Sequence, residues 1–465
     1  MMALLLIALS GHLAFWFWRS RPGILIRLAK DSARLVDGMV QPGDDDAKLE
    51  ALETRTAQVL ISFVLFLFWV AVGMAIMVSL PWGWEIAMNR QDGLAAFSSW
   101  QGLLAISAGG TLGLLYPKGK PSSSSYSSMN QLVHHLMLDH HHLQRWLHNR
   151  EVKGWRKKGG ISEPKFLLVT GLARAGTTSL LQRLMETDAF SSLHYGHMPL
   201  VVAPGTWSRW NKPKETALKE RSHGDGILVG ADSAEALEEP FWRLRNEAGY
   251  VQEDVLEPHR VSAEDHAAYL DFQGLVRENG KVYLAKNNNA LLRYPALRSH
   301  NKDFRVVLMF REPLVHAASL LAMHQRYTAM QSEDPFVKTY MDWLAHHEFG
   351  LGHKPFRFDA GTGRTSGSTS DPDTLEYWLD RWMDYYEHAR TADAHGVLFV
   401  SHEMWSRRPS EVLAAVLDEV GVVGAPLNLE PHVRKRKAED TVEAAQLQRA
   451  EALYGRLMER ALHLD

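Results

Sequence analysis

One segment of the chain has the residue types and spacing of a phosphate-binding loop. Residues 166–180 read Phe-Leu-Leu-Val-Thr-Gly-Leu-Ala-Arg-Ala-Gly-Thr-Thr-Ser-Leu, with Gly171 and Gly176 followed by Thr177 and Thr178. This is the frame of the Gly-x-x-x-x-Gly-Lys-Ser/Thr motif. Glycines let backbone N–H groups converge on an anion, and the helix that follows adds the positive end of its dipole. The segment therefore predicts an anion site between a strand and a helix.

The loop differs from that of nucleoside triphosphatases at one position. Thr177 stands where their lysine reaches the β- and γ-phosphates. Arg174, inside the loop, supplies a positive charge instead. A donor without a γ-phosphate does not need the lysine, and no acidic strand end of the Walker B type is evident. We therefore expect no metal at this site.

A second segment, residues 305–319, has a strand pattern that ends before Arg311. Pro313 then opens a helix, a position that suits proline, and Ser319 falls on its second turn. Arg311 and Ser319 can both point at one phosphate near the carboxyl edge of the sheet. The alternative is an arginine at an ordinary strand–helix junction.

The elements around these segments predict an α/β domain over residues 161–465. Short β-branched runs alternate with helical patterns, which indicates a P-loop-like parallel sheet flanked by helices. The expected strands are residues 166–169, 282–284, 305–309 and 397–400, and the expected helices are residues 178–186, 291–297, 314–324 and 409–420. Residues 350–373 are rich in Gly, Ser and Thr and predict either a mobile lid or an unstructured insert.

The first 120 residues predict a helical membrane anchor. Three uncharged stretches, residues 2–18, 59–80 and 94–116, are expected to form transmembrane helices, the first of them only marginally long enough. The third is rich in Gly, Ser and Ala, which suits helix packing in lipid. The alternative is that these stretches are core helices of a soluble domain.

Lys and Arg residues are concentrated in residues 19–56 and recur after residue 116. The positive-inside rule therefore predicts a multi-pass protein of the cell inner membrane with its catalytic domain in the cytoplasm. Residues 121–160 are expected to form a Ser-rich linker and one His-rich helix over residues 132–150. His135 and His142 would share a face of that helix, as metal ligands or simply as solvated side chains.

Composition excludes several classes of function. Lys and Arg total 51 and Asp and Glu total 54, so the net charge is -3 and we expect no nucleic-acid partner. The chain has no cysteine. A disulfide framework, a thiolate zinc site, an iron–sulfur cluster and a cysteine nucleophile are therefore ruled out.

Taken together, the two phosphate-binding segments resemble those of the sulfotransferases that use 3′-phosphoadenosine 5′-phosphosulfate (PAPS). Further segments resemble a bacterial-type branch of that family: residues 193–207, 222–228, 233–242, 286–289 and 400–403. The resemblance extends over residues 165–422 and does not include the anchor. It implies PAPS as co-substrate, with no metal required.

The resemblance also implies a role for each matching residue. The 5′-phosphosulfate would be held by the loop and the start of its helix, and the 3′-phosphate by Arg311 and Ser319. The implied loop residues are Arg174, Ala175, Gly176, Thr177, Thr178 and Ser179. Arg174 would also act in catalysis by neutralising the charge of the donor.

The resemblance does not identify the base that takes the proton of the acceptor. Cytosolic members have a histidine in the region that here reads Lys-Asn-Asn-Asn at residues 286–289. Lys286 could bridge to the leaving group or be an ordinary surface lysine. We favour His223 as base, because its ordinary pKa lies nearest neutrality, with Glu239 as the alternative.

These observations predict a membrane-anchored sulfotransferase that moves a sulfuryl group from PAPS to a hydroxyl or amine acceptor. Its location beside the bilayer suggests a lipid or glycan acceptor. Two other functions remain open at this point: a P-loop kinase-like phosphotransferase, and a non-catalytic nucleotide-binding membrane protein.

Overall fold

The computed structural model forms two compact units, residues 1–143 and 144–465. The residues that it describes are 2–40, 45–88, 95–115, 128–210, 219–220, 228–229, 233–246, 249–358, 371–392, 395–432 and 442–464.

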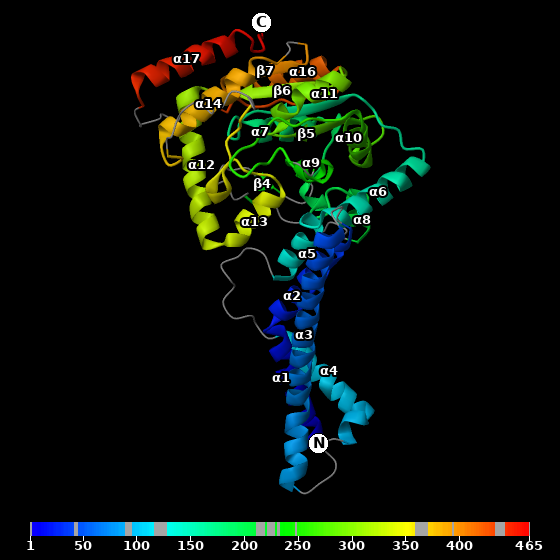
Figure 1. Ribbon diagram of the computed structural model, residues 1–465. Coiled ribbons are helices and arrows are strands. Elements are labelled where there is room, and N and C mark those ends of the chain that lie inside the picture. Colours follow the sequence, from blue (N-terminus) through cyan, green and yellow to red (C-terminus); the bar gives the residue numbers. More distant parts are fainter. Residues whose placement is uncertain are drawn as a thin grey trace. The chain divides into compact units, whose positions relative to one another are not determined.

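The first unit is helical. Figure 1 shows α1 and α2 alongside the long helix α3, and α4 packs against α1. Its elements are α1 (Met2–Arg19), α2 (Pro22–Val40), α3 (Asp45–Met88), the 3₁₀ turn η1 (Ala95–Ser98), α4 (Trp100–Leu115) and α5 (Ser128–Leu138). By length and composition, α1 and residues 51–88 of α3 can cross a bilayer.

The third expected span is shorter than predicted. Residues 94–116 were expected to form one transmembrane helix, but the structure has η1 followed by a 16-residue α4. A helix of that length is about 24 Å long, less than the roughly 30 Å hydrocarbon core. The structure therefore does not contain the single long helix that was expected there.

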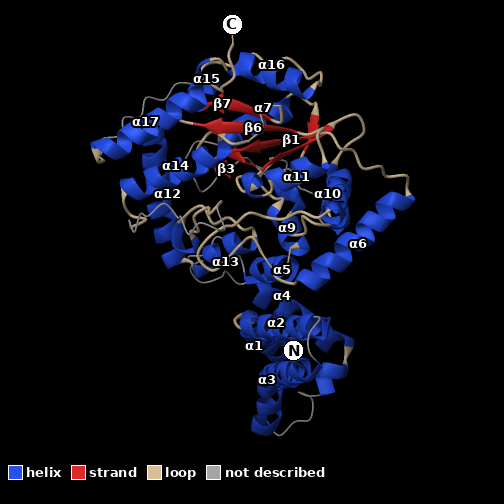
Figure 2. Cartoon of the chain, turned by 45° about the horizontal axis from the view of Figure 1, so that its top comes forward, coloured by secondary structure: helices blue, strands red, loops and turns tan. Residues whose placement is uncertain are grey.

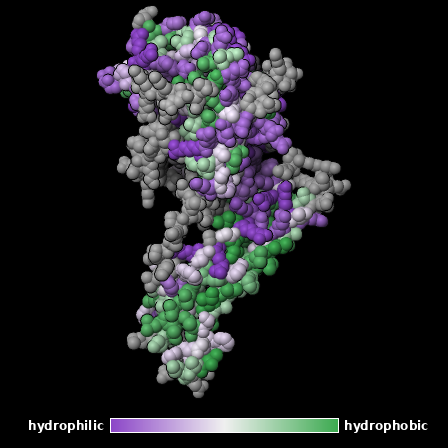
Figure 3. Space-filling model, turned by 90° about the vertical axis from the view of Figure 1, so that its left-hand side faces the viewer, coloured by the Kyte–Doolittle hydropathy of each residue, from purple (hydrophilic) through white to green (hydrophobic). Residues whose placement is uncertain are grey.

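Small residues bring α1 and α4 close together, as the composition of this stretch indicates. A Cβ atom at Gly109 would lie 1.9 Å from the carbonyl oxygen of Ala8, so no larger residue fits. A Cβ at Gly11 would lie 3.2 Å from the carbonyl oxygen of Ile106. By contrast, Leu60, Val64 and Phe68 of α3 are exposed. Figure 3 shows hydrophobic residues gathered over the helices of this unit.

The prediction of one His-rich helix over residues 132–150 is wrong. The chain forms α5 and then α6 (His141–Lys157), with a break at Asp139 and His140. The ring of His140 contacts the carboxylate of Asp37 on α2, which holds the chain where the first helix ends. His135 and His142 therefore lie on different helices and share no helix face.

The second unit is built on a five-stranded sheet in the order β2-β5-β1-β6-β7, in which all neighbouring strands are parallel. Figure 2 shows β1, β6 and β7 side by side, with helices on both sides of the sheet. The strands are β1 (Phe166–Thr170), β2 (Phe190–Ser191), β5 (Val282–Lys286), β6 (Arg305–Phe310) and β7 (Val397–Ser401). The predicted α/β class is confirmed.

Helices and short 3₁₀ turns surround this sheet, and a separate two-stranded ribbon pairs β3 (Lys219–Glu220) with β4 (Leu228–Val229). The helices are α7 (Thr177–Glu186), α8 (Pro204–Trp210), α9 (Glu239–Arg245), α10 (Ala263–Val276), α11 (Tyr294–His300), α12 (Pro313–Glu333), α13 (Pro335–Trp343), α14 (Leu375–Ala389), α15 (His402–Arg407), α16 (Pro409–Val420) and α17 (Ala444–Met458). The 3₁₀ turns are η2 (Tyr195–His197), η3 (Ala290–Leu292) and η4 (Gly350–Gly352).

Successive side chains of a strand point to opposite faces of the sheet, and helices bury both faces. Leu167 and Val169 of β1 belong to a buried cluster with residues of α7 and α16. Phe166 instead meets Tyr269 of α10, with ring centroids 5.6 Å apart. A parallel sheet that is covered on both faces leaves its carboxyl edge as the place where loops present polar side chains.

Candidate active site

The predicted phosphate loop lies at the carboxyl edge of the sheet, between β1 and α7. Gly171 has a φ of 144°, and a Cβ there would lie 2.4 Å from the carbonyl oxygen of Met309 on β6. Gly176, just before α7, has a φ of 101°. Both glycines are thus required by backbone geometry, and the loop passes close to the neighbouring strand.

The first turn of α7 presents its backbone to this loop. The first N–H groups of an α-helix have no partner within the helix, so they are available to an anion. Thr177 and Thr178, which begin the helix, are both buried. The hydroxyl of Ser179 accepts a hydrogen bond from the indole of Trp405 at 3.3 Å. Ala175 is fully buried, and its N–H donates to the carbonyl of Leu172, which closes the turn.

The second predicted segment begins where β6 ends. Glu312 caps α12, since its carboxylate accepts from the N–H groups of Leu314 and Val315 at 3.1 and 2.7 Å. The N–H of Glu312 in turn donates to the carboxylate of Glu403, just after β7, at 3.2 Å. These bonds fix the backbone that follows Arg311, which is half-buried.

The two predicted segments meet. Nε of Arg174 in the loop donates to Oγ of Ser319 on α12 at 3.4 Å. One turn before Ser319, Nε2 of His316 donates to the carbonyl of Ala173 at 2.8 Å. The phosphate loop and the β6–α12 junction therefore form one site, although 145 positions separate Arg174 from Ser319.

Positive charge gathers at this site. Burial lowers the pKa of His402 to about 4, and the charges of Arg311, His432 and Arg174 add to the effect. Burial likewise lowers the pKa of His316 to about 3, with Arg311, His402 and Arg174 contributing. In the described part of the chain, Nδ1 of each of these two rings is buried without a hydrogen-bond partner. The two rings are therefore neutral near pH 7, and an anion at this site would be attracted by the charges of Arg174 and Arg311.

Buried neutral histidines predict that the protein loses stability in mild acid. The pKa is lowered to about 3 or 4 in six of them, in each case mainly by burial: His135, His197, His259, His316, His353 and His402. Their unfolded forms take up protons below pH 6.5, whereas the folded forms do not. Stability is therefore complete above pH 6.5 and falls as the pH drops towards 3.

Between the unfolded and folded pKa values, each histidine lowers the free energy of unfolding by about 1.4 kcal/mol per pH unit. Denaturant midpoints of the full-length protein in detergent, measured at pH 7.5 and 5.5, check this expectation. The variant His402→Gln should show a smaller decrease of the denaturant midpoint between pH 7.5 and 5.5. Equal midpoints for the wild type at the two pH values would contradict it.

Lys286 lies next to the loop and is not a surface lysine. It ends β5, which pairs with β1, and it is buried. Its Nζ contacts the carboxylate of Glu235 at 2.9 Å, and the same carboxylate accepts from the hydroxyl of Tyr195 at 3.2 Å. This places Lys286 and Glu235 together at the carboxyl edge of the sheet.

Glu239 is held in a buried ion pair. Its two oxygens accept from Nη1 and Nη2 of Arg293 at 2.7 and 3.0 Å, and the hydroxyl of Tyr250 also donates to it. Burial alone would raise the pKa of Glu239, but the Arg293 guanidinium outweighs it and brings the pKa to about 2. Such a carboxylate is a weak proton acceptor and has no contact with the loop in the bonds above. This ion pair argues against Glu239 as the base.

His223, the favoured base, lies outside the described residues, as does much of the segment around it. Within the described residues, no group of three or more His, Cys, Asp or Glu side chains is arranged to hold a metal ion.

No protein-family model matches the sequence, and no curated protein matches it. Solved structures similar to the chain include three bacterial sulfotransferases. STF1 of Mycobacterium tuberculosis has a TM-score of 0.36 at 15% identity, over 72% of this chain and 84% of that one. STF9 of Mycobacterium avium has a TM-score of 0.35 at 12% identity, over 72% and 79%. A sulfotransferase of Alicyclobacillus acidocaldarius has a TM-score of 0.27 at 15% identity, over 64% and 94%.

Two residues at the site were not among the predicted ones. A Cβ at Gly176 would lie 2.9 Å from Nδ1 of His402, so the ring of His402 borders the loop. His402 follows closely after the strand predicted at residues 397–400. That position could have indicated a site residue, because the carboxyl ends of all strands in a parallel sheet lie at one edge. Glu235 offered no such signal, since no predicted element places it beside Lys286.

Proposed function

We propose that the protein is a sulfotransferase that moves a sulfuryl group from PAPS to a hydroxyl acceptor. The observation that carries the proposal is the contact of Arg174 with Ser319, which joins a glycine-rich loop to the arginine-bearing β6–α12 junction. A donor with phosphate groups at both ends of an adenosine needs two such anion sites. The loop and the β6–α12 junction, which meet at one edge of one sheet, would supply them.

The residues present fit this donor. The backbone N–H groups that begin α7 and the guanidinium of Arg174 would hold the 5′-phosphosulfate. Arg311 and Ser319 would hold the 3′-phosphate. His402 would contribute a further donor beside Gly176, where its Nδ1 has no partner in the described chain. Sulfuryl transfer, like phosphoryl transfer, relies on such positioning and on charge stabilisation at the peripheral oxygens.

Two observations favour this reading over a kinase-like phosphotransfer. Thr177 takes the lysine position and is buried at the start of α7. The two carboxylates that fix the backbone after Arg311 are already engaged, Glu312 by the first turn of α12 and Glu403 by the N–H of Glu312 and the hydroxyl of Tyr454. Carboxylates held in this way by backbone and hydroxyl donors are not arranged to coordinate magnesium.

The same proposal includes a location. The length and apolar composition of α1 and α3 support a membrane anchor, and the Lys and Arg distribution supports a catalytic unit on the cytoplasmic side of the inner membrane.

The full-length protein in detergent, incubated with ³⁵S-labelled PAPS and a panel of alcohols and phenols, tests the activity. We expect saturable binding of adenosine 3′,5′-bisphosphate and transfer of label to at least one acceptor without added metal. Turnover of magnesium ATP with no binding of PAPS would favour the kinase-like alternative. Binding of PAPS with no transfer across the panel would favour the non-catalytic one.

A further inference from the structure

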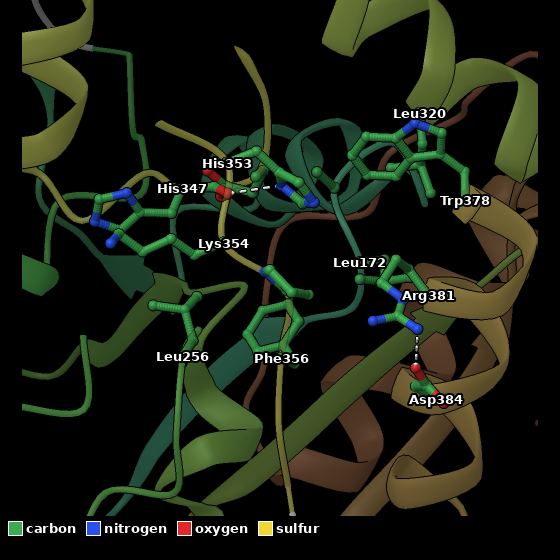
Figure 4. A pocket seen from close by; sticks show the side chains of 13 residues that line it. Leu172, Leu256, Leu320, His347, His353, Lys354, Phe356, Trp378, Arg381 and Asp384 are labelled. Atoms are coloured by element: carbon green, nitrogen blue, oxygen red, sulfur yellow. Dashed lines mark hydrogen bonds and ion pairs between the residues drawn. The ribbon is translucent and has the colours of Figure 1, made fainter. Parts of the chain in front are cut away.

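A cavity opens beside the phosphate loop, on the side that carries Leu172 and Ala173 (Figure 4). Its space, counted with the part of the mouth that is open to solvent, is about 470 Å³. Its wall is formed mainly by apolar and aromatic side chains from the loop, α12, α14 and residues 256 and 356: Leu172, Leu256, Leu320, Phe356 and Trp378. A molecule bound here would lie next to the loop that we propose holds the donor.

The ionisable side chains that line the cavity are, with one exception, engaged with each other or with the backbone. Arg381 contacts Asp384 at 2.9 Å. The ring of His353 contacts the carbonyl of His347 at 3.1 Å and the hydroxyl of Tyr377 at 2.8 Å, and lies 4.7 Å from Trp378.

Two further side chains in the cavity wall, His347 and Lys354, are engaged with backbone carbonyls. Nδ1 of His347 contacts the carbonyl of Gly352 at 2.9 Å. Nζ of Lys354 donates to the carbonyls of Gln252 and Glu253. Burial is the main cause that lowers the pKa of both His347 and His353, so these rings are neutral near pH 7.

Glu348 is the exception. Its Oε1 accepts from Nδ2 of Asn288 at 2.9 Å, and no hydrogen bond to its Oε2 is found in the described part of the chain. Asn288 lies just beyond β5, where the hydroxyl of Thr170 at the end of β1 donates to the carbonyl of Asn287 at 2.7 Å. The Oδ1 atom of Asn288 is buried without a partner among the described residues. The cavity wall therefore includes a carboxylate, Glu348, which is held by an amide just beyond β5.

We propose that this cavity holds the acceptor of the sulfuryl transfer proposed above, an apolar alcohol or phenol, and that Glu348 is the base for its hydroxyl. The inference rests on the proposed function. The hydroxyl oxygen of the acceptor forms a bond to sulfur while the bond from sulfur to the 5′-phosphate oxygen breaks. Adenosine 3′,5′-bisphosphate leaves with the electron pair, and the carboxylate of Glu348 takes the proton and later releases it to water.

The chemistry of the wall decides the class of acceptor. A glycan needs many hydrogen-bonding partners, whereas this wall is apolar apart from groups that are largely occupied. An apolar body with a single hydroxyl would fill it and direct that hydroxyl towards Glu348. The chemistry is shared by free phenols and by lipid alcohols, so the test includes both.

The test uses the full-length protein in detergent with PAPS and three acceptors: 2-naphthol, dodecanol and glucose. We expect transfer to at least one of the first two and not to glucose. The glutamine in Glu348→Gln keeps a side-chain oxygen that can accept the hydrogen bond from the Asn288 amide, but it cannot take a proton from the substrate hydroxyl. It should lower kcat by about 100-fold or more, with the affinity for adenosine 3′,5′-bisphosphate unchanged.

Two further variants separate proton transfer from a structural effect. Formate should restore part of the activity of Glu348→Ala, because it can enter the vacated space as a substitute base. Phe356→Leu should raise the KM for the apolar acceptor and leave the KM for PAPS unchanged. Glu186→Gln, which alters only an exposed pair with Arg183 at the end of α7, is the matched control and should behave as the wild type.

The outcomes distinguish the two proposals. If the wild type transfers sulfuryl groups and Glu348→Gln stays within about threefold of it, Glu348 is not the base, and the proposed function stands. If glucose is the preferred acceptor, the assignment of the cavity is overturned. If the wild type neither binds adenosine 3′,5′-bisphosphate nor transfers label, the proposed function fails, and the assignment of Glu348 fails with it.

Discussion

Replacing Arg311 with alanine should weaken binding of adenosine 3′,5′-bisphosphate by about 30-fold to a few thousand-fold. Removing one member of a buried, hydrogen-bonded charge pair costs roughly 2–5 kcal/mol, and each 1.4 kcal/mol is a factor of about ten. Arg311 is half-buried at the end of β6, and the backbone that follows it is fixed by Glu312 and Glu403.

Isothermal titration of the full-length protein with adenosine 3′,5′-bisphosphate measures this effect. Arg305→Ala is the control, because Arg305 begins the same strand at its opposite end and pairs with Glu419 at 3.0 Å. That variant should bind as the wild type does. Arg174→Ala should resemble Arg311→Ala, since Arg174 connects the loop to Ser319. Normal binding by both arginine variants would overturn the assignment of the donor site.

The parts of this site that lie on regular elements could be predicted from the sequence. The strands expected at residues 305–309 and 397–400 differ by one residue from β6 and β7, and the helix expected at 409–420 coincides with α16. Apolar runs between glycines and charged residues indicate buried strands directly. Because the carboxyl ends of parallel strands share one edge, the meeting of Arg174 with Ser319 also follows from pattern alone.

The partners of the remaining site residues could not be predicted in this way. Glu348 lies between α13 and η4, on a segment with no periodic pattern. Its contact with Asn288 spans 60 positions and depends on how that segment folds back over the sheet. The same is true of Glu235 beside Lys286. Single carboxylates on irregular segments give no spacing signal, so a structure is needed to pair them.

In the first unit, the boundaries of the helices could not be predicted from the sequence. Hydropathy located the apolar stretches, but it does not report where a helix begins or ends. The expected span at residues 59–80 lies within α3, a single helix that continues through Pro81 to Met88. The break between α5 and α6 depends on the contact of His140 with Asp37, on a helix about 100 positions earlier. Neither boundary has a local sequence signal.

Replacing Glu239 with glutamine should lower the free energy of unfolding by about 3–5 kcal/mol, the cost of leaving a buried charge without its partner. Arg293 is 1% exposed, and its guanidinium lies 4.8 Å from the Trp242 ring and 4.9 Å from the Tyr250 ring. Glutamine preserves the size of the side chain but not its charge. Urea denaturation of the full-length protein in detergent, followed by tryptophan fluorescence, measures the loss.

The double variant Glu239→Gln/Arg293→Met should recover much of this stability, because a pair of uncharged side chains can replace a buried ion pair at little cost. Glu264→Gln is the matched control. Glu264 contacts Arg245 at 2.9 Å, but its side chain is 85% exposed, so the change should cost no more than about 1 kcal/mol. A Glu239→Gln protein with wild-type stability and no transfer activity would contradict this account. It would return Glu239 to the role of base that the sequence left open, and it would show that Arg293 tolerates a neutral neighbour in the core.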